Sequence, residues 1–361
     1  MRVLPVLGIG LAVGLVIAGC GSGAGSSGSA APSSAGAGGA KPTITVGLSA
    51  VTTVSAELYL GRTQGFFAKH GVTVNLTNTG STSATEAAAG RVDLVQVGCS
   101  SALAPAVAGH QTSIVFWMLA NNAGIQVPAG SALRPANTAA GSVMELAGKR
   151  IAVQGVGTGA YGEAQAMRAY IGAHGAKPPV VVSLPNASAI SAQLVSGQVD
   201  AAVGAADVVA GAVADGKVRI LVRAENPGLK EVSGGDVAGV CLWGLKSKLA
   251  QEPKAVAAFI AGMRDAYRYV TATQPATIAG ILHTTKDFGS LGVDTVEQSL
   301  GYDVPLFTTS AGQLTPAVWE TTLKAFAGWG LGLNLSDPRL SYGDIVDMSY
   351  WNASTALLGG S

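Results

Sequence analysis

The chain has little of what metal, nucleic-acid or nucleophilic chemistry requires. Its 361 residues include four histidines and three cysteines, and only 12% are charged, with a formal net charge of +1. A nucleic-acid-binding protein usually carries a basic excess, and this chain has none, so we expect no nucleic-acid partner. Aromatic residues make up 6%, whereas 48% of residues are hydrophobic and 50 are glycine. The length predicts about two domains.

Motifs for catalysis and for cofactors are also missing. The histidines are isolated in the sequence, without partners at metal-ligand spacing, so we expect no metal site. There is no Walker-type Gly-Lys-Ser/Thr sequence and no Gly-x-Ser-x-Gly elbow. A glycine-rich loop, Gly155 to Gly159, follows a predicted strand, but no acidic residue follows a second strand about twenty residues later, as in a dinucleotide site. We therefore expect neither catalytic residues nor a cofactor.

The first residues are typical of an export signal. Met1 and Arg2 give a positive start, and Val3 to Ile17 is an apolar run shorter than the ~20 residues of a membrane span. The run ends in Ile17-Ala18-Gly19-Cys20, which resembles the lipobox of bacterial lipoproteins. This resemblance implies that residues 1–19 are a signal peptide and that the Cys20 thiol carries diacylglycerol. An ordinary secretory signal with an incidental Cys20 is the alternative.

Residues 20–40 are almost entirely Gly, Ser and Ala. Such a segment is typical of a flexible tether that packs into no core. Together with the lipobox it predicts an extracytoplasmic protein, anchored to the cell membrane by its lipid.

Acylation of Cys20 leaves Cys99 and Cys241. An exported protein meets oxidising conditions, in which two cysteines can form a disulfide. Two buried free thiols fit the spacing equally well, so the residues alone leave the pairing open.

The remainder of the chain alternates predicted strands and helices. This alternation indicates an α/β protein with parallel-rich sheets covered on both faces. The predicted strands are residues 43–49, 72–78, 93–98, 112–119, 151–154, 180–184, 201–204, 218–223 and 237–245, and the predicted helices are 56–70, 83–90, 102–109, 161–172 and 190–196. Apolar residues at helical spacing predict two further core-facing helices in the tail, at 253–270 and 315–330.

One phrase occurs twice. Gly90-Arg91-Val92-Asp93 and Gly197-Gln198-Val199-Asp200 each place a glycine at the end of a predicted helix and an aspartate at the start of a strand. The repeat predicts that the two halves of the chain share the same local helix-to-strand connection.

Four blocks in order carry a resemblance to a known family: AELYLGRTQGFFAKHGVTV, AAAGRVDLVQVG, VMELAGKRIAVQG and QLVSGQVDAAVG. They resemble the substrate-binding proteins of bacterial ABC importers, in the branch for taurine, alkanesulfonates, nitrate and thiamine-pyrimidine precursors. The resemblance spans roughly residues 43–329. It implies a two-lobed periplasmic-binding-protein-like clamp, each lobe a mostly parallel sheet with helices on both faces, joined by two hinge crossings.

The resemblance also implies the division of the chain. Domain one would comprise residues 41–121 and 237–361, and domain two the inserted residues 122–236. The strand that returns to domain one would lie antiparallel beside the third strand. That arrangement favours a disulfide between Cys99 and Cys241, joining the two sequence-distant parts of domain one.

In such a clamp the ligand site lies between the lobes, at the loops that follow the strands. Hydroxyl groups and backbone N–H groups before a helix start favour anionic groups, and glycines let a ligand approach the backbone. Thr158 is also expected to cap a helix. The candidate ligand-binding residues in these loops are Ser49, Val51, Thr52, Cys99, Ser100, Ser101, Gly157, Thr158, Gly159 and Tyr161. For each loop, a plain helix cap without a ligand is the alternative.

Two more residues could tune the choice of ligand. Asp207 follows a strand of domain two, where its carboxylate could accept an amino or amide group, although it could equally cap the next helix. Asn121 lies near the first crossing. None of the candidate loops contains an arginine for a bidentate clamp on a strong anion. This leaves neutral, zwitterionic or heteroaromatic ligands open.

The function that this resemblance implies is capture of a small-molecule solute without covalent chemistry. The partners would be an ABC permease and its ATPase subunit, and a monomer is expected. Two alternatives remain: an enzyme on the same scaffold, similar to thiamine-pyrimidine synthase, and a ligand-sensing lipoprotein without a transporter. The enzyme would need a reactive His or Lys in the cleft, and the candidate loops contain none.

Overall fold

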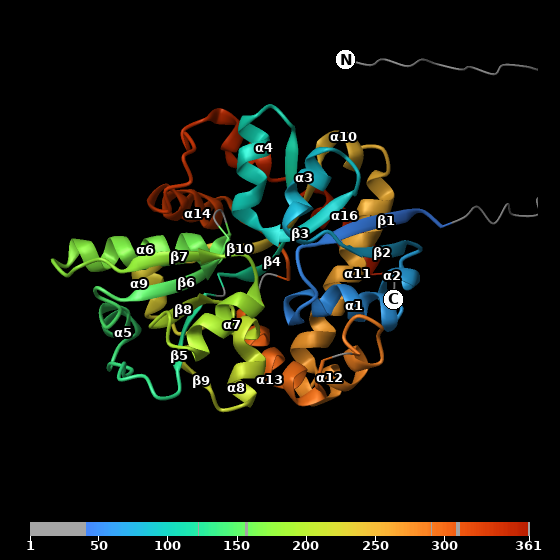
Figure 1. Cartoon of the computed structure of the whole chain (residues 1–361). Helices are drawn as coiled ribbons and strands as arrows, with labels where there is room; N and C mark the ends of the chain where they lie inside the picture. The colour runs from blue at the N-terminus through green and yellow to red at the C-terminus, as the bar shows by residue number, and fades with distance from the viewer. Residues whose placement is uncertain (1–40, 122, 156–157, 290, 308–310, 360–361) are drawn as a thin grey trace, which may run out of the picture. The chain divides into compact units, whose positions relative to one another are not determined.

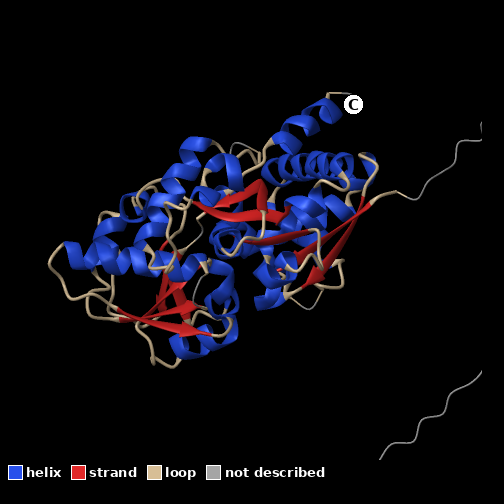
Figure 2. Ribbon diagram, turned by 90° about the horizontal axis from the view of Figure 1, so that it is seen from above, coloured by secondary structure: helices blue, strands red, loops and turns tan. Residues whose placement is uncertain are grey.

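The structure is a computed structural model that describes residues 41–121, 123–155, 158–289, 291–307 and 311–359. Residues 41–361 form one compact unit. Its described strands form two separate five-stranded sheets, each covered by helices (Figures 1 and 2). The expected signal peptide, the tether and Cys20 lie outside the described residues.

Each sheet has the same strand order. The first sheet runs β2-β1-β3-β10-β4 and the second β7-β6-β8-β5-β9. In both sheets the first three strands are parallel, and the strand in the fourth position, β10 or β5, is antiparallel to both of its neighbours. The strands are β1 (Thr43–Leu48), β2 (Thr73–Asn78), β3 (Leu94–Gly98), β4 (Thr112–Ala120), β5 (Gly124–Pro128), β6 (Arg150–Gln154), β7 (Val180–Leu184), β8 (Ala201–Gly204), β9 (Val218–Val222) and β10 (Ala238–Leu245).

The helices cover both faces of each sheet (Figure 1). The α-helices are α1 (Ala56–Thr63), α2 (Phe66–Lys69), α3 (Ser83–Ala88), α4 (Leu103–Val107), α5 (Ala139–Met144), α6 (Gly159–Ala173), α7 (Ala187–Val195), α8 (Ala210–Ala214), α9 (Leu229–Ser233), α10 (Lys246–Leu249), α11 (Pro253–Ala272), α12 (Pro275–His283), α13 (Val293–Asp303), α14 (Pro316–Gly328), α15 (Tyr342–Ile345) and α16 (Ser349–Leu358). The 3₁₀ turns are η1 (Thr53–Ser55), η2 (Gly80–Thr82), η3 (Cys99–Ala102), η4 (Ala206–Val209), η5 (Val304–Leu306) and η6 (Pro338–Leu340).

The repeated Gly-x-Val-Asp phrase has the same structural role in both sheets. Asp93 Oδ2 accepts a 2.8 Å hydrogen bond from the backbone N–H of Thr45, and Asp200 Oδ2 accepts one of the same length from Arg150. The aspartate N–H groups return hydrogen bonds to the carbonyls of Thr45 and Arg150. Each carboxylate therefore fixes the register between the third-position strand and its parallel neighbour.

Apolar side chains fill both faces of each sheet, as the alternation of strands and helices predicts. One cluster packs α1, α11, α12 and α13 against the first sheet, and a second packs α4, α14 and α15 against its other face. The tail helices bury the predicted stripe, which includes Val256, Phe259 and Met263 on α11 and Trp319 and Phe326 on α14. Two further clusters lie on the faces of the second sheet.

Several local predictions need correction. The single helix predicted for residues 56–70 is two helices, α1 and α2, because Gly65 has a φ of 76° and breaks the helix. Strand β5 was not predicted. The mostly parallel sheets that the resemblance implies are confirmed: four strands of each sheet run in one direction, and β10 or β5 runs opposite to both of its neighbours.

Candidate functional site

The loops that follow β1 and β3 in the first sheet meet the loops that follow β6 and β8 in the second. Burial raises the pKa of Asp207, which follows β8, and the Thr52 hydroxyl, which follows β1, acts on this carboxyl group in the opposite direction. At a second point, a Cβ atom added to Gly98 would lie 3.7 Å from the backbone nitrogen of Gly159. The structure therefore brings together four loops that the sequence places far apart.

Several predicted site residues also support the local backbone. Ser101 Oγ donates to the Gly98 carbonyl (2.7 Å) and accepts from Trp243 Nε1 (3.0 Å). Thr158 caps α6, since its hydroxyl oxygen accepts a hydrogen bond from the Tyr161 N–H (3.2 Å). These hydroxyl groups hold their loops in shape.

The other predicted residues are distributed as follows. The backbone N–H of Ser49 donates to the Gln96 carbonyl (3.3 Å), and Val51 packs against the first core cluster. Ser100 is buried, and Tyr161 packs against a core cluster of the second sheet. Gly157 lies outside the described residues.

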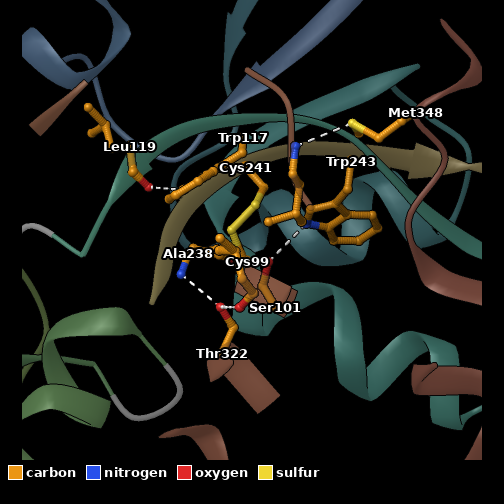
Figure 3. The surroundings of a disulfide bond; sticks show 12 residues. Cys99, Ser101, Trp117, Leu119, Ala238, Cys241, Trp243, Thr322 and Met348 are labelled. Carbon is orange, nitrogen blue, oxygen red and sulfur yellow. Dashed lines mark hydrogen bonds between the residues drawn. A yellow bond between two sulfur atoms is a disulfide. The ribbon is translucent and has the colours of Figure 1, made fainter. Parts of the chain in front are cut away.

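The predicted disulfide is present. Cys99, directly after β3, is bonded to Cys241 in β10, and both residues are fully buried, with Cα atoms 5.0 Å apart (Figure 3). The bond joins segments 142 residues apart in the sequence. Because its sulfur atom forms this bond, Cys99 has a structural role in the loop that follows β3.

Three carboxyl groups meet beside the Thr52 loop. Glu57 lies in the first turn of α1, Asp303 is the last residue of α13, and Asp207 lies in η4. Asp303 Oδ2 accepts a 2.5 Å hydrogen bond from the Thr53 hydroxyl. Burial and the nearby charge of Asp207 raise the pKa of Asp303, while burial, reinforced by the charge of Asp303, raises the pKa of Glu57. We refer to Glu57, Asp207 and Asp303 as the acidic cluster.

The sequence interpretation found only one member of this cluster, Asp207. Glu57 did carry a signal, because it is a carboxylate directly before the apolar run Leu58-Tyr59-Leu60 in a core-facing helix. Asp303 carried none, since its partner Thr53 is 250 residues away. The cluster also alters the expectation for the Ser49–Thr53 loop, because buried carboxyl groups lie at the place that we predicted to favour anions.

A fourth buried carboxyl group lies where the chain crosses between the sheets. Glu163 on α6 accepts a 3.0 Å hydrogen bond from Ser233 Oγ at the end of α9, and Asn121 lies close enough to influence the pKa of this carboxyl group. Asn121 lies on the first crossing, and its N–H donates to the Val237 carbonyl on the return crossing (3.0 Å). Burial raises the pKa of Glu163 to about 7.

A pocket of about 320 Å³ lies beside the two crossings, within the size range of small-molecule sites. Its wall combines aromatic and apolar side chains with polar groups. The lining residues include Trp117, Asn121, Glu225, Lys230, Ser233, Asp236, Leu306 and Phe307. A narrow crevice lined by Asp303, Tyr302, Arg223 and Ala206 shares Ala224, Glu225 and Leu306 with this pocket. Of the acidic cluster, Asp303 thus lines a crevice that adjoins a volume able to hold a small molecule.

Within the described residues, no group of three or more His, Cys, Asp or Glu side chains could hold a metal ion. No helix in the described ranges is long and apolar enough to cross a membrane.

A sequence model of the family described as NMT1/THI5 like matches residues 52–277, more than half of the chain. No curated protein sequence matches the chain. Solved structures do match, although at identities that show the fold alone.

Three solved structures illustrate this likeness. The alkanesulfonate-binding protein SsuA from Xanthomonas axonopodis pv. citri, bound to MOPS, has a TM-score of 0.62 and 20% identity, over 81% of this chain and 95% of that one. The nitrate-binding protein NrtA from Synechocystis PCC 6803 has a TM-score of 0.65 and 16% identity, over 87% and 89%. A ligand-binding component of an ABC-type import system from Staphylococcus aureus, with zinc bound, has a TM-score of 0.66 and 15% identity, over 86% and 98%. The chain therefore has the two-lobed type II periplasmic-binding-protein fold.

Proposed function

Because the chain belongs to the NMT1/THI5-like family, we propose that it is the extracytoplasmic solute-binding component of an ABC import system. It captures a small molecule between its lobes and delivers it to a membrane permease, and ATP is hydrolysed on a separate subunit. The chain itself performs no covalent step.

The observation that carries this proposal is the contact between loops of the two sheets. The Thr52 hydroxyl lies close enough to Asp207 to influence the pKa of its carboxyl group, and Gly98 approaches Gly159, although each pair comes from different sheets. Loops that can touch across a cleft can also enclose a solute there, and hinge closure is the usual way in which two-lobed binding proteins do so. The proposed ligand-contacting residues are those of the four loops, together with Asn121.

In this proposal the lobes comprise residues 41–121 with 237–361, and residues 122–236. The two sheets agree with that division, since β10 pairs with β3 and β4, and β5 pairs with β8 and β9. Residues 1–19 would be removed on export, and Cys20 would carry the diacylglycerol that holds the protein, through the tether, at the membrane surface.

The experiment that tests this function is thermal unfolding of residues 41–361 with a panel of solutes. The panel contains taurine, alkanesulfonates, nitrate, aromatic acids, aminopyrimidines and amino acids, and mass spectrometry follows each compound for turnover. A ligand at about 100 times its dissociation constant stabilises the folded state by about 2.7 kcal/mol, which raises the melting temperature by several degrees. A shift by an unconverted compound supports the proposal. Conversion of that compound would instead support an enzyme on this scaffold.

A further inference from the structure

The acidic cluster joins the two lobes. Glu57 and Asp303 belong to helices that pack in the same core cluster of the first sheet, whereas Asp207 follows β8 of the second sheet. Helix α13, which ends in Asp303, contacts η1 on one side and both η4 and α8 on the other. Any group held by all three carboxyls would therefore hold the lobes together.

The carboxyl oxygens of the cluster have fewer partners than burial normally requires. Glu57 is fully buried, and neither of its carboxylate oxygens has a hydrogen-bond partner within the described residues. Asp207 Oδ1 is buried in the same way. A buried carboxyl group without a partner costs several kcal/mol, and protein structures rarely retain one unless something compensates it.

The surrounding charges do not supply this compensation. The charges that act on Asp303 are those of Asp207 and Glu225, which are both negative. Arg223 is the basic group nearest in the crevice, but its guanidinium pairs with Glu225 and lies 4.7 Å from the ring centre of Tyr302. None of the ion pairs in the described parts of the chain includes a member of the acidic cluster.

The adjoining volume suits an organic molecule better than a metal ion. Asp303 and Glu225 line the crevice, and Glu225 also lines the 320 Å³ pocket. The described carboxyl groups do not converge closely enough to form a metal site. A larger cation can reach them with separate N–H groups, each making a charge-assisted hydrogen bond.

We propose that the acidic cluster binds the protonated nitrogen of an organic cation, an ammonium or amidinium group, whose remainder occupies the pocket beside the crossings. This inference rests on the proposed function and names the chemical class of its solute. Thr53 holds Asp303 in place by its hydrogen bond, Glu57 is a further buried carboxyl group close to Asp303, and the bound cation, which favours the ionised form of these groups, joins carboxyls of both lobes. Recognition of the cation's charge by these carboxyl groups and closure of the two lobes then occur together.

The test compares organic cations with anions on the unit of residues 41–361. Melting temperatures are measured at pH 7.5 and equal ionic strength with the chlorides of putrescine, agmatine and choline, with magnesium chloride, and with sodium ethanesulfonate and sodium nitrate. Calorimetry gives the affinity of any compound that shifts the melting temperature. Asp303→Asn is the test variant because asparagine keeps an oxygen that accepts the Thr53 hydrogen bond. Asp294→Asn, at the exposed other end of α13, is the matched control.

We expect at least one organic cation to raise the melting temperature of the wild type and of Asp294→Asn. Asp303→Asn should bind it at least about tenfold more weakly, since it removes one charged partner. Without ligand, Asp303→Asn should melt at the wild-type temperature or above it, because a buried repulsion is removed. If that variant does not fold, Asp207→Asn replaces it with the same expectation.

The inference is overturned if the organic cations produce no shift, if Mg²⁺ alone produces it, or if affinity is unchanged in Asp303→Asn. Binding of ethanesulfonate or nitrate in place of the cations would overturn the ligand class while supporting the proposed function. If neither these probes nor any compound of the solute panel shifts the melting temperature, the result would count against both the inference and the proposed function.

Discussion

The indole ring of Trp329 lies directly against Gly162. A Cβ atom added to Gly162 would lie 1.8 Å from Trp329 Cε3, closer than any real contact. Gly162 lies in α6, which leads out of the second sheet, and Trp329 follows α14 and packs in a core cluster of the first sheet. The absence of a side chain at residue 162 therefore permits the two lobes to pack together at this point.

Replacing Gly162 by alanine should weaken the contact between the lobes. Glycine to alanine within a helix normally stabilises by about 1 kcal/mol. Here the added methyl group overlaps the indole, and we expect a net loss of about 1–3 kcal/mol, the usual cost of overpacking. Urea unfolding measures this loss. Gly172→Ala is the control on the same helix, because its Cβ would meet only Pro178 Cγ at 3.4 Å. A Gly162→Ala protein as stable as Gly172→Ala would contradict the packing.

The Cys99–Cys241 bond should stabilise the protein substantially. It closes a loop with a sequence separation of 142 residues, for which loop entropy predicts an upper value of about 5 kcal/mol, and native disulfides typically contribute about 2–5 kcal/mol. Urea unfolding with and without reductant should show a loss of that size. Residues 41–361 contain no other cysteine. Thiol titration in denaturant should therefore detect no free thiol before reduction and two after it, and two free thiols beforehand would refute the bond.

The two register-setting aspartates should differ in how much they stabilise. Asp93 and Asp200 make the same backbone hydrogen bond, but Asp93 also pairs with Lys248 Nζ at 3.2 Å and is less exposed. We expect Asp200→Ala to lower the free energy of unfolding by about 1 kcal/mol and Asp93→Ala by about 1.5–3 kcal/mol. Urea unfolding of both variants decides the order. A larger loss for Asp200→Ala would contradict the additional stabilisation that we assign to Asp93.

Glu163 should make stability depend on pH. Burial raises its pKa from 4.5 to about 7. Below pH 4.5 the group is protonated in both the folded and the unfolded state. Between pH 4.5 and about 7 the unfolded chain loses the proton while the folded chain keeps it, so the free energy of unfolding falls as the pH rises, by an amount on the order of 3 kcal/mol, and then levels off.

The measurement for this prediction is the difference in the free energy of unfolding between wild type and Glu163→Gln, from pH 4 to pH 8. The variant cannot lose a proton, so the wild type should lose stability relative to it across that window. Groups with lowered pKa values, such as Asp265, act alike in both proteins and cancel in the difference. A difference that stays constant with pH would refute the buried, protonated state of Glu163.

Local patterns predicted most of the strands and the covering helices, because apolar spacing and glycine positions are local. They did not predict β5, a five-residue strand that begins with Gly124 and ends with Pro128, two residue types that weaken a strand signal. They also merged α1 with α2 across Gly65, where only the backbone angle reveals the break. The antiparallel pairing of β10 with β3 came from family resemblance, since the segments lie more than 130 residues apart and no local pattern joins them.

The sequence predicted which loops form the candidate site, but it did not predict which side chains interact there. The position of a loop follows from the end of a strand, so the sequence was enough to choose Thr52, Thr158 and Asp207. The partners of these residues depend on how two lobes meet, and Asp303 reaches Thr53 from 250 residues away. Glu163 was missed for the same reason, because its hydrogen-bond partner Ser233 lies 70 residues away at the end of α9 and its neighbour Asn121 lies on the first crossing.

The central claim is that a small solute is held between the lobes by loops of both. Hydrogen exchange of residues 41–361, followed by mass spectrometry with and without the solute that gives the largest thermal shift, tests it most directly. The account predicts slower exchange on binding in the Ser49–Ser55 and Gly98–Leu103 segments of one lobe and, together with them, in the Thr158–Gly162 and Ala205–Val209 segments of the other. Protection confined to a single lobe, or absent from all four segments, would contradict it.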